Sequence, residues 1–256
     1  MNQLVWLVTV VGLLTPSPLA SSALPAEPLA VPDGLGVNIH FTHPRPGEMK
    51  MIADAGFTWV RMDFAWEGTE REKGIYDFGE YDDLLKSLDE FSIRPIFILD
   101  YSNRFYDGHL SPHTPEGIAA FAKWAAAAVT HFKGHAIVWE IYNEPNGSFW
   151  KPKADAEALM RLSLATGKAI HEADAAATFV GPATSTIDFP YLETCFKGGC
   201  LGDWAAVSVH PYRQTYPERA GDEYRRLREL IGRYASPGEQ IPILSGEWGY
   251  STAWQS

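Results

Sequence analysis

Short apolar runs alternate with amphipathic segments along most of the chain. The runs, bounded by Gly, Pro or acidic residues, predict buried strands, and apolar residues spaced three or four apart predict helices between them. The predicted strands cover residues 34–41, 59–66, 95–99, 136–144, 178–180, 204–209 and 241–244. The predicted helices cover residues 49–55, 81–91, 115–134, 153–173 and 224–234. Two of these helices carry start signals, a capping box over residues 77–80 and a Thr114 N-cap followed by Pro115.

Strand and helix alternate seven times without a change in composition, which predicts one α/β domain with a parallel sheet. An open dinucleotide-binding sheet would show a glycine fingerprint after its first strand. Here Gly34 and Gly36 stand at the start of the strand, and no third glycine follows in register. Polar or charged residues recur instead at many strand ends, which is typical of the mouth of a (β/α)8 TIM barrel. These residues are His40, Arg61, Asp100, Glu144, His210 and Glu247.

The C-terminal end is short for such a barrel. Only nine residues follow Glu247, too few for an eighth strand and the last two helices. Because an unclosed barrel would expose strand edges, which natural folds avoid, we expect a C-terminally truncated chain rather than an open barrel.

The N-terminal end has the pattern of an export signal. Residues 4–14 form an apolar stretch that is too short to span a bilayer, and Ser21–Ala23 offers a cleavage site, although Met1–Gln3 contains no Lys or Arg. We therefore expect a signal peptide over residues 1–23, a Pro-rich linker over 24–33 and the barrel domain over 34–256. A buried N-terminal helix is the alternative. This organisation predicts a secreted or periplasmic protein, and no later segment has the length and hydropathy to span a membrane.

The only cysteines, Cys195 and Cys200, flank residues 196–199. In an exported protein this spacing favours a disulfide that closes a small loop, and free thiols are the alternative. Two cysteines are too few for a four-cysteine zinc site.

Composition narrows the class of ligand. The chain is 46% hydrophobic and 13% aromatic, with nine Trp and eleven Tyr, which fits either core filling or stacking on sugar rings. The formal net charge of −11 argues against nucleic acid as a partner, because phosphate neutralisation needs a basic face.

Two predicted strands end in a glutamate. Glu144 stands between Asn143 and Pro145, and Glu247 follows the run that begins at residue 241. Glycoside hydrolysis needs two carboxyl groups, one that protonates the leaving oxygen and one that attacks or activates water. For either glutamate alone, a surface carboxylate or a structural ion pair is the alternative.

Three further residues are candidates to support these carboxylates. Arg61 would hold Glu247 ionised and Tyr212 would hydrogen-bond to it, whereas a structural ion pair for Arg61 and a core pair of His210 with Tyr212 are the alternatives. Because His40 and His43 lack a third ligand nearby, we predict neither a metal nor a cofactor.

These motifs resemble those of clan A glycoside hydrolases, and among them the cellulase-like family 5 and the xylosidase-like family 39. The segment Trp139–Pro145 resembles their fourth-strand motif, and Ser245–Trp248 looks like their seventh-strand nucleophile segment. The segment His210–Tyr212 is similar to their sixth-strand His-x-Tyr, and Val60–Arg61 matches a second-strand arginine that supports the nucleophile.

The resemblance implies a (β/α)8 barrel that hydrolyses glycosides with retention of anomeric configuration. It implies Glu144 as acid/base, Glu247 as nucleophile and Asn143 as a ligand of the sugar 2-hydroxyl. The families also carry an aromatic platform on an eighth strand, which this chain does not reach. The residues that the resemblance makes candidate sugar contacts are His40, Trp66, Tyr101, Trp150 and Trp248.

The sequence therefore predicts a secreted β-glycosidase that cleaves a β-linked oligo- or polysaccharide by double displacement. Two alternatives remain open. One is a non-catalytic carbohydrate-binding protein on a barrel scaffold, for which two carboxylates are not needed. The other is a metal-dependent barrel hydrolase.

Overall fold

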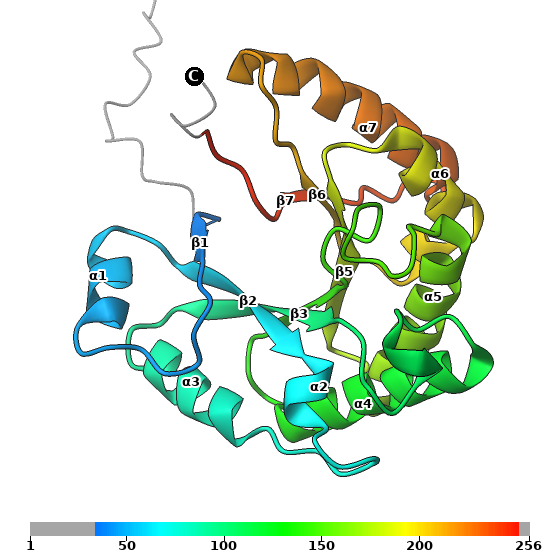
Figure 1. The fold of residues 1–256 in the computed structure, drawn as a ribbon. Helices are drawn as coiled ribbons and strands as arrows, with labels where there is room; N and C mark the ends of the chain where they lie inside the picture. Colours follow the sequence, from blue (N-terminus) through cyan, green and yellow to red (C-terminus); the bar gives the residue numbers. More distant parts are fainter. Residues whose placement is uncertain (1–33, 251–256) are drawn as a thin grey trace, which may run out of the picture. The chain divides into compact units, whose positions relative to one another are not determined.

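Seven parallel strands form one curled sheet, in which each strand pairs with the next one along the chain. The computed structural model describes residues 34–250, and Figure 1 shows the strands around a common centre with the helices outside them. The strands are β1 (Gly36–Asn38), β2 (Trp59–Ala65), β3 (Arg94–Asp100), β4 (Val138–Ile141), β5 (Thr178–Ser185), β6 (Val207–His210) and β7 (Ile243–Ser245). Within the described residues β1 and β7 do not pair, so the sheet is an incomplete TIM barrel.

Helices follow the strands and cover the outside of the sheet, which confirms the predicted α/β fold. Short 3-10 segments at Asp107–His109, Cys200–Gly202 and Pro217–Arg219 interrupt the connections. The helices are α1 (Glu48–Asp54), α2 (Trp66–Thr69), α3 (Gly79–Asp89), α4 (Pro115–His131), α5 (Ala156–Ala173), α6 (Phe189–Lys197) and α7 (Ala220–Tyr234). The sequence pattern did not predict α2 and α6.

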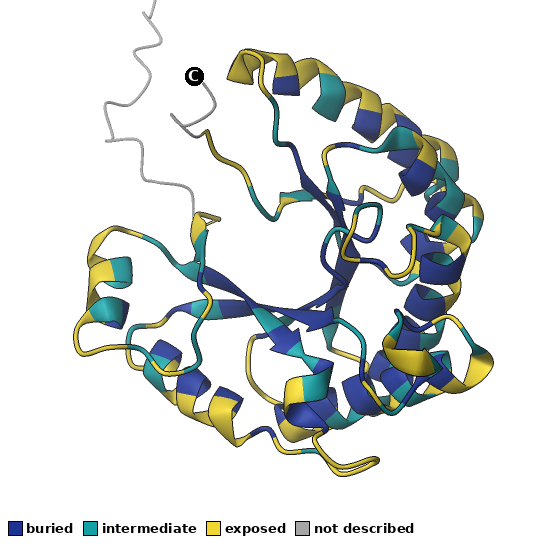
Figure 2. Cartoon of the chain, in the orientation of Figure 1, coloured by how far each residue is buried: buried dark blue, intermediate teal, exposed yellow. Residues whose placement is uncertain are grey.

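Side chains along β2 point alternately to the two faces of the sheet, so its apolar residues face the helices and its polar residues face the centre of the barrel. Phe64 faces the helices, where its ring centroid lies 4.3 Å from that of Tyr81 and 5.5 Å from that of Trp124. Arg61 and Asp63 point to the opposite face and line a cavity at the centre of the sheet. Figure 2 shows the buried strands and the buried inner faces of the helices in dark blue. The main core thus lies between sheet and helices, and the concave face carries polar groups.

One of the two predicted helix starts is confirmed. The Thr114 hydroxyl accepts a hydrogen bond from the backbone N–H of Gly117 at 3.1 Å, as an N-cap does. The predicted capping box is wrong. The carboxylate of Asp77 accepts a hydrogen bond from the backbone N–H of Gly79 at 3.0 Å instead of from that of Glu80, and α3 has no side-chain cap. The Glu80 side chain is therefore free to contact other segments.

Cys195 and Cys200 are free, buried thiols, so the predicted disulfide is not formed in the structure. The sulfur of Cys200 is directed at the backbone carbonyl of Met160, 3.9 Å away. The predicted signal peptide (residues 1–23) and linker (24–33) lie outside the described residues. Within residues 34–250, no helix combines the length and the hydropathy needed to cross a bilayer.

Candidate active site

The two predicted catalytic glutamates meet at the carboxyl ends of the strands. The backbone after β4 turns through left-handed conformations at Tyr142 (φ 57°) and Glu144 (φ 43°). The N–H of Glu144 is held by the carbonyl of Ala183 at 3.0 Å. Such conformations cost roughly 1–3 kcal/mol each for residues other than glycine and are concentrated at functional sites. Here they direct Asn143 and Glu144 into the central cavity.

Arg61 on β2 connects three partners that are distant in sequence. Its Nε donates to Glu140 at 2.6 Å, its Nη1 to Glu247 at 2.6 Å, and its Nη2 to Asn143 at 2.8 Å. Burial lowers the pKa of Arg61, but the carboxylates of Glu140 and Glu247 outweigh burial, and its pKa is raised above the ordinary value. A permanent cation therefore orients one oxygen of Glu247.

Two tyrosines complete the hydrogen bonds around this cation. The Tyr212 hydroxyl donates to the second oxygen of Glu247 at 3.2 Å, and Asn143 Nδ2 donates to the Tyr101 hydroxyl at 3.1 Å. Burial, and then Glu247, raises the pKa of Tyr212 above its usual value, so the phenol keeps its proton as a donor. The second N–H of the Asn143 amide has no partner in these bonds.

His210 on β6 lies between the two glutamates. Its Nδ1 is 3.0 Å from Oε1 of Glu144 and 3.7 Å from Oε1 of Glu247. Ligand atoms of all three side chains lie within 4.8 Å of one another, so an oxygen of Glu144 and an oxygen of Glu247 are that close. The two carboxyl groups therefore lie close together at the centre of the cavity.

The same three side chains are the cluster within residues 34–250 whose composition would suit a metal ion. The Nδ1 of His210 lies at hydrogen-bond distance, 3.0 Å, from Oε1 of Glu144.

A buried acid stands at the end of β3, next to this site. Both carboxyl oxygens of Asp100 are buried without a hydrogen-bond partner within the described chain. Burial, and then the neighbouring Asp63, raises the pKa of Asp100 well above its usual value, which favours the neutral acid.

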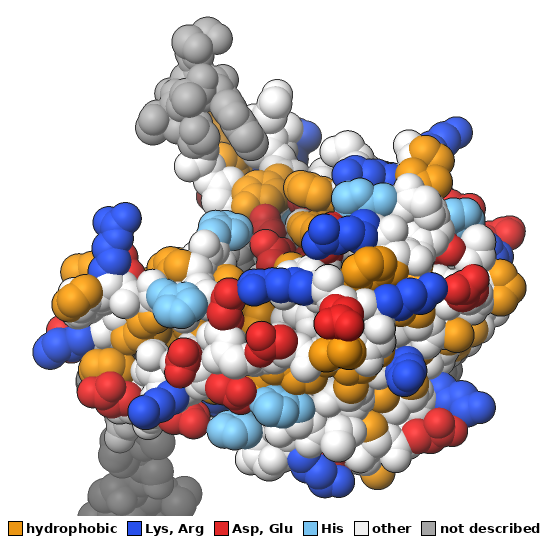
Figure 3. All heavy atoms as spheres, turned by 60° about the horizontal axis from the view of Figure 1, so that its bottom comes forward, with side chains coloured by type: hydrophobic (Ala, Val, Ile, Leu, Met, Phe, Trp, Pro, Cys, Tyr) orange, Lys and Arg blue, Asp and Glu red, His pale blue; other side chains and the backbone are white. Residues whose placement is uncertain are grey.

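The central cavity has a volume of about 640 Å³, which is in the range of small-molecule sites. Most of the predicted site residues line it, and His210, which contacts Glu144, is not part of the lining. On the face shown in Figure 3, acidic and basic side chains are interspersed rather than separated into one basic surface. The predicted residues in the lining are His40, Arg61, Tyr101, Asn143, Glu144, Tyr212 and Glu247.

Three predicted sugar contacts lie elsewhere. Trp66 is 1% exposed and stacks on Tyr106 at 5.0 Å, and Trp150 is 2% exposed and packs on Tyr142 at 4.8 Å. Both rings belong to the core because their faces are covered, so neither offers a surface to a sugar. Trp248 is 42% exposed but does not belong to the described lining of the cavity.

Sequence reasoning missed three residues of the site. Glu140 is a fully buried partner of Arg61, and Asp63 and Phe149 line the cavity. The signal for Asp63 was present, because it follows Arg61 by two residues on the same face of a strand. Phe149 gave no periodic signal; its ring stacks on Tyr101 at 5.5 Å and is 44% exposed.

The sequence profile of the family described as Cellulase (glycosyl hydrolase family 5) matches residues 36–255. The chain is 28% identical over 125 residues to the 6-phospho-beta-glucosidase of Dickeya chrysanthemi, a match that covers 45% of this chain and 27% of that protein.

Solved structures with the same fold include a family 39 glycoside hydrolase from Bacteroides cellulosilyticus WH2, with a TM-score of 0.69 and 19% identity over 84% of this chain and 49% of that one. A family 39 β-xylosidase from Caulobacter crescentus has a TM-score of 0.68 and 24% identity over 88% of this chain and 56% of that one. The chain thus spans about half the length of these structures, and the likeness confirms the barrel fold.

Proposed function

Because the chain belongs to the cellulase family, glycosyl hydrolase family 5, within clan A, we propose that its central cavity is the active site of a retaining β-glycosidase. The observation that carries the proposal is that one carboxylate oxygen of Glu144 lies within 4.8 Å of one of Glu247, close enough for the two carboxyl groups to act on one bond. Retaining enzymes hold their two carboxyl groups about 5–5.5 Å apart, whereas inverting enzymes leave about 6.5–9.5 Å for a water molecule.

The surroundings of the two glutamates support different roles. Glu247 receives Arg61 at 2.6 Å and the Tyr212 hydroxyl at 3.2 Å, so its charge is compensated and its oxygens are oriented. This arrangement suits a nucleophile. Glu144 contacts His210, and among the described residues no guanidinium is shown bonded to it, which suits the acid/base role.

The reaction then has two steps. An oxygen of Glu247 attacks the anomeric carbon, the bond to the leaving oxygen breaks, and Glu144 gives its proton to that oxygen. In the second step Glu144 takes a proton from water, the water oxygen bonds to the anomeric carbon, and the ester to Glu247 breaks. Asn143 supports the first step by directing its remaining amide N–H to the sugar 2-hydroxyl.

The charge of the cavity favours a neutral sugar. Among the described lining residues, Asp63, Glu144 and Glu247 are acidic and Arg61 is the cation. Arg61 already donates to two carboxylates, of Glu140 and Glu247, and to the amide oxygen of Asn143, so its positive charge is compensated by protein groups. We therefore propose a neutral β-linked saccharide as substrate, unlike the phosphorylated one in the name of the Dickeya relative. The proposed setting is outside the cytoplasm, as residues 1–23 predict.

Mechanism-based labelling tests this proposal. The chain is incubated with 2-deoxy-2-fluoro glycosides of several neutral β-sugars, and adducts are located by intact mass and peptide mapping. We expect one sugar on Glu247, and none on a Glu247→Gln variant of the same chain. A folded chain that forms no adduct with any sugar, or an adduct on another residue, would refute the assignment and leave a carbohydrate-binding role.

A further inference from the structure

Three side chains at the catalytic centre have the chemistry and the spacing of a transition-metal site. Nδ1 of His210 lies 3.0 Å from Oε1 of Glu144 and 3.7 Å from Oε1 of Glu247, and ligand atoms of all three lie within 4.8 Å of one another. Ligand atoms of a tetrahedral zinc ion, each about 2.0–2.2 Å from it, are about 3.3–3.6 Å apart. An ion therefore fits among the three groups once the two carboxylates approach each other by up to about 1 Å.

The fold holds each of these groups in place before an ion arrives. His210 is a buried residue at the end of β6, and the backbone N–H of Glu144 is bonded to a carbonyl of β5. Glu247 accepts hydrogen bonds from Arg61 and from the Tyr212 hydroxyl. Donors that orient a ligating carboxylate in this way are typical of protein metal sites. The ligands are thus preorganised, and little conformational freedom is lost when an ion binds.

The other ring nitrogen of His210 leaves Nδ1 available as a ligand. A histidine that binds a metal through Nδ1 carries its proton on Nε2. Nε2 of His210 is buried and has no hydrogen-bond partner within the described chain. No donor among these residues therefore forces Nε2 to be the acceptor and the proton to stay on Nδ1.

The charges around the three groups attract a cation. The carboxylates of Glu140 and Glu247 share one guanidinium, that of Arg61. Glu144 and Asp63 add two more carboxylates at the lining of the same cavity. Ionised carboxylates therefore outnumber the cation, and such an excess raises the affinity of a cavity for a divalent ion.

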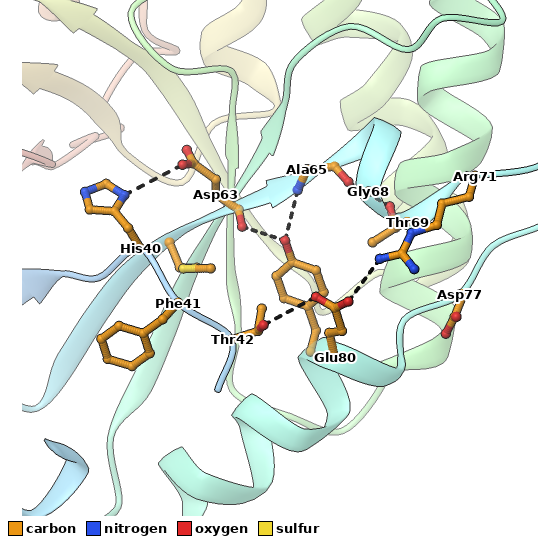
Figure 4. Close-up of a pocket in the computed structure, with 12 residues that line it drawn as sticks. His40, Phe41, Thr42, Asp63, Ala65, Gly68, Thr69, Arg71, Asp77 and Glu80 are labelled. Carbon is orange, nitrogen blue, oxygen red and sulfur yellow. Dashed lines mark hydrogen bonds and ion pairs between the residues drawn. The ribbon is translucent and has the colours of Figure 1, made fainter. Parts of the chain in front are cut away.

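A second histidine–carboxylate pair lies at the edge of the same cavity and is the competing position for an ion. Nδ1 of His40 is 3.9 Å from Oδ2 of Asp63, and Figure 4 shows the two side chains directed at each other. The His40 side chain is 81% exposed, and the described chain places no third ligand in a cluster with this pair. Two ligands, one of them largely in solvent, hold a metal ion more weakly than three.

We propose that Glu144, His210 and Glu247 form a zinc-binding site, and that a bound ion blocks the reacting centre. The binding rests on the geometry alone, whereas the effect on catalysis rests on the proposed function. The ion occupies the oxygen lone pairs with which Glu247 attacks and Glu144 holds its proton. Zn²⁺ is therefore an inhibitor that competes with the glycoside, and not a cofactor.

Calorimetric titration of Zn²⁺ into the full chain tests the site without any need for turnover. We expect one ion to bind at this site. Glu144→Gln removes a ligand charge and His210→Gln removes the imidazole, and each should raise the Kd about 100-fold or more, because losing a group that merely supports a ligand already costs about 10–100-fold. The Glu144 side chain is 18% exposed, so its isosteric variant is expected to fold. His131→Gln, which removes an exposed histidine 2.8 Å from Asp82, is the matched control and should leave the Kd unchanged.

Steady-state kinetics with an aryl β-glycoside test the effect on the active site. Zn²⁺ should raise KM with increasing concentration and leave kcat unchanged, and a chelator should restore the original KM. Mg²⁺ should bind far more weakly than Zn²⁺, because imidazole suits zinc whereas magnesium prefers oxygen ligands alone.

The site would be overturned by a native chain that takes up no Zn²⁺ at millimolar concentration. Equal affinity for Mg²⁺ would also overturn it, as would zinc binding that is lost in His40→Gln but kept in His210→Gln. Activation by Zn²⁺, with loss of activity in a chelator, would overturn both the inhibition and the proposed function. If the native chain cleaves no glycoside with or without Zn²⁺, the proposed function fails alone, and the titrations still decide whether the metal site exists.

Discussion

Replacing Arg61 by Met should lower both the stability of the protein and its activity, and the two losses have different causes that can be measured separately. The substitution leaves Glu140, whose side chain is 0% exposed, as a buried carboxylate without its partner at 2.6 Å. Breaking a buried ion pair in this way costs about 3–5 kcal/mol, a large part of the roughly 5–15 kcal/mol that stabilises a typical domain. With a urea m-value of about 2–3 kcal/mol/M, the unfolding midpoint should fall by roughly 1–2.5 M.

The catalytic loss has another origin. Glu247 loses the donor at 2.6 Å that orients it, and we expect kcat to fall about 10²–10³-fold, as it does when one preorganised donor is removed from an active site. A second variant, Arg61→Met/Glu140→Gln, separates the two effects. It removes the unpaired buried charge, so more than half of the lost stability should return. The activity should not return, because Glu247 still lacks its donor.

Urea unfolding followed by tryptophan fluorescence and steady-state kinetics on the same preparations measure both quantities. A single variant that unfolds at the native urea concentration would contradict the role of Arg61 as the partner of a buried charge. A double variant that regains activity would contradict its role in orienting Glu247.

Two further substitutions test the surroundings of the site. A β-carbon at Gly246 would lie 3.0 Å from Nε2 of His210, so Gly246→Ala should displace that ring and lower kcat about tenfold or more, whereas Gly249→Ala, with open space around it, should leave kcat within twofold. Asp100→Asn should stabilise the protein at neutral pH, because burial and Asp63 raise the folded-state pKa of Asp100. Because the folded-state pKa is the higher one, the contribution of Asp100 to the free energy of unfolding is fully present below the pKa of the unfolded chain, about 3.9. That contribution is lost as the pH rises toward the folded-state pKa. In urea titrations, the difference in free energy of unfolding between the Asp100→Asn variant and the native protein should therefore grow above about pH 4. A difference that does not change with pH would contradict this.

The order of strands could be read from the sequence because apolar runs and amphipathic segments alternate regularly. The length of β5 could not. It runs over Thr178–Ser185, whereas the apolar pattern ended at Val180. Its continuation contains Gly181, where a β-carbon would lie 2.3 Å from the side chain of Ile141. The continuation is a strand because Gly181, Thr184 and Ser185 pair with β6, and pairing between distant segments has no periodic signature in the sequence.

The proximity of Glu144 and Glu247 could be predicted from the sequence, because each follows an apolar strand and parallel strands end at the same edge of the sheet. The aromatic sugar contacts could not be predicted in the same way, because a tryptophan in the core and one that binds a sugar look alike in the sequence. In the structure Trp66 and Trp150 are covered by neighbouring rings. The role of Glu140 also needed the structure, since a carboxylate inside an apolar run reveals its partner only when Arg61, 79 residues away, is placed beside it.

The three bonds of Arg61 also set the order in which the site can be assembled during folding. Its partners Glu140 and Asn143 lie 79 and 82 residues further along the chain, and Glu247 lies 186 residues further. During synthesis the guanidinium can therefore meet its first carboxylate when four strands exist, but its last one only when the seventh has emerged. Contacts of such sequence separation form late, because the intervening chain must be ordered first. Partly folded forms would then hold the buried pair of Arg61 and Glu140 while Glu247 is still unoriented, so that the complete set of bonds around Arg61 forms only when β7 docks.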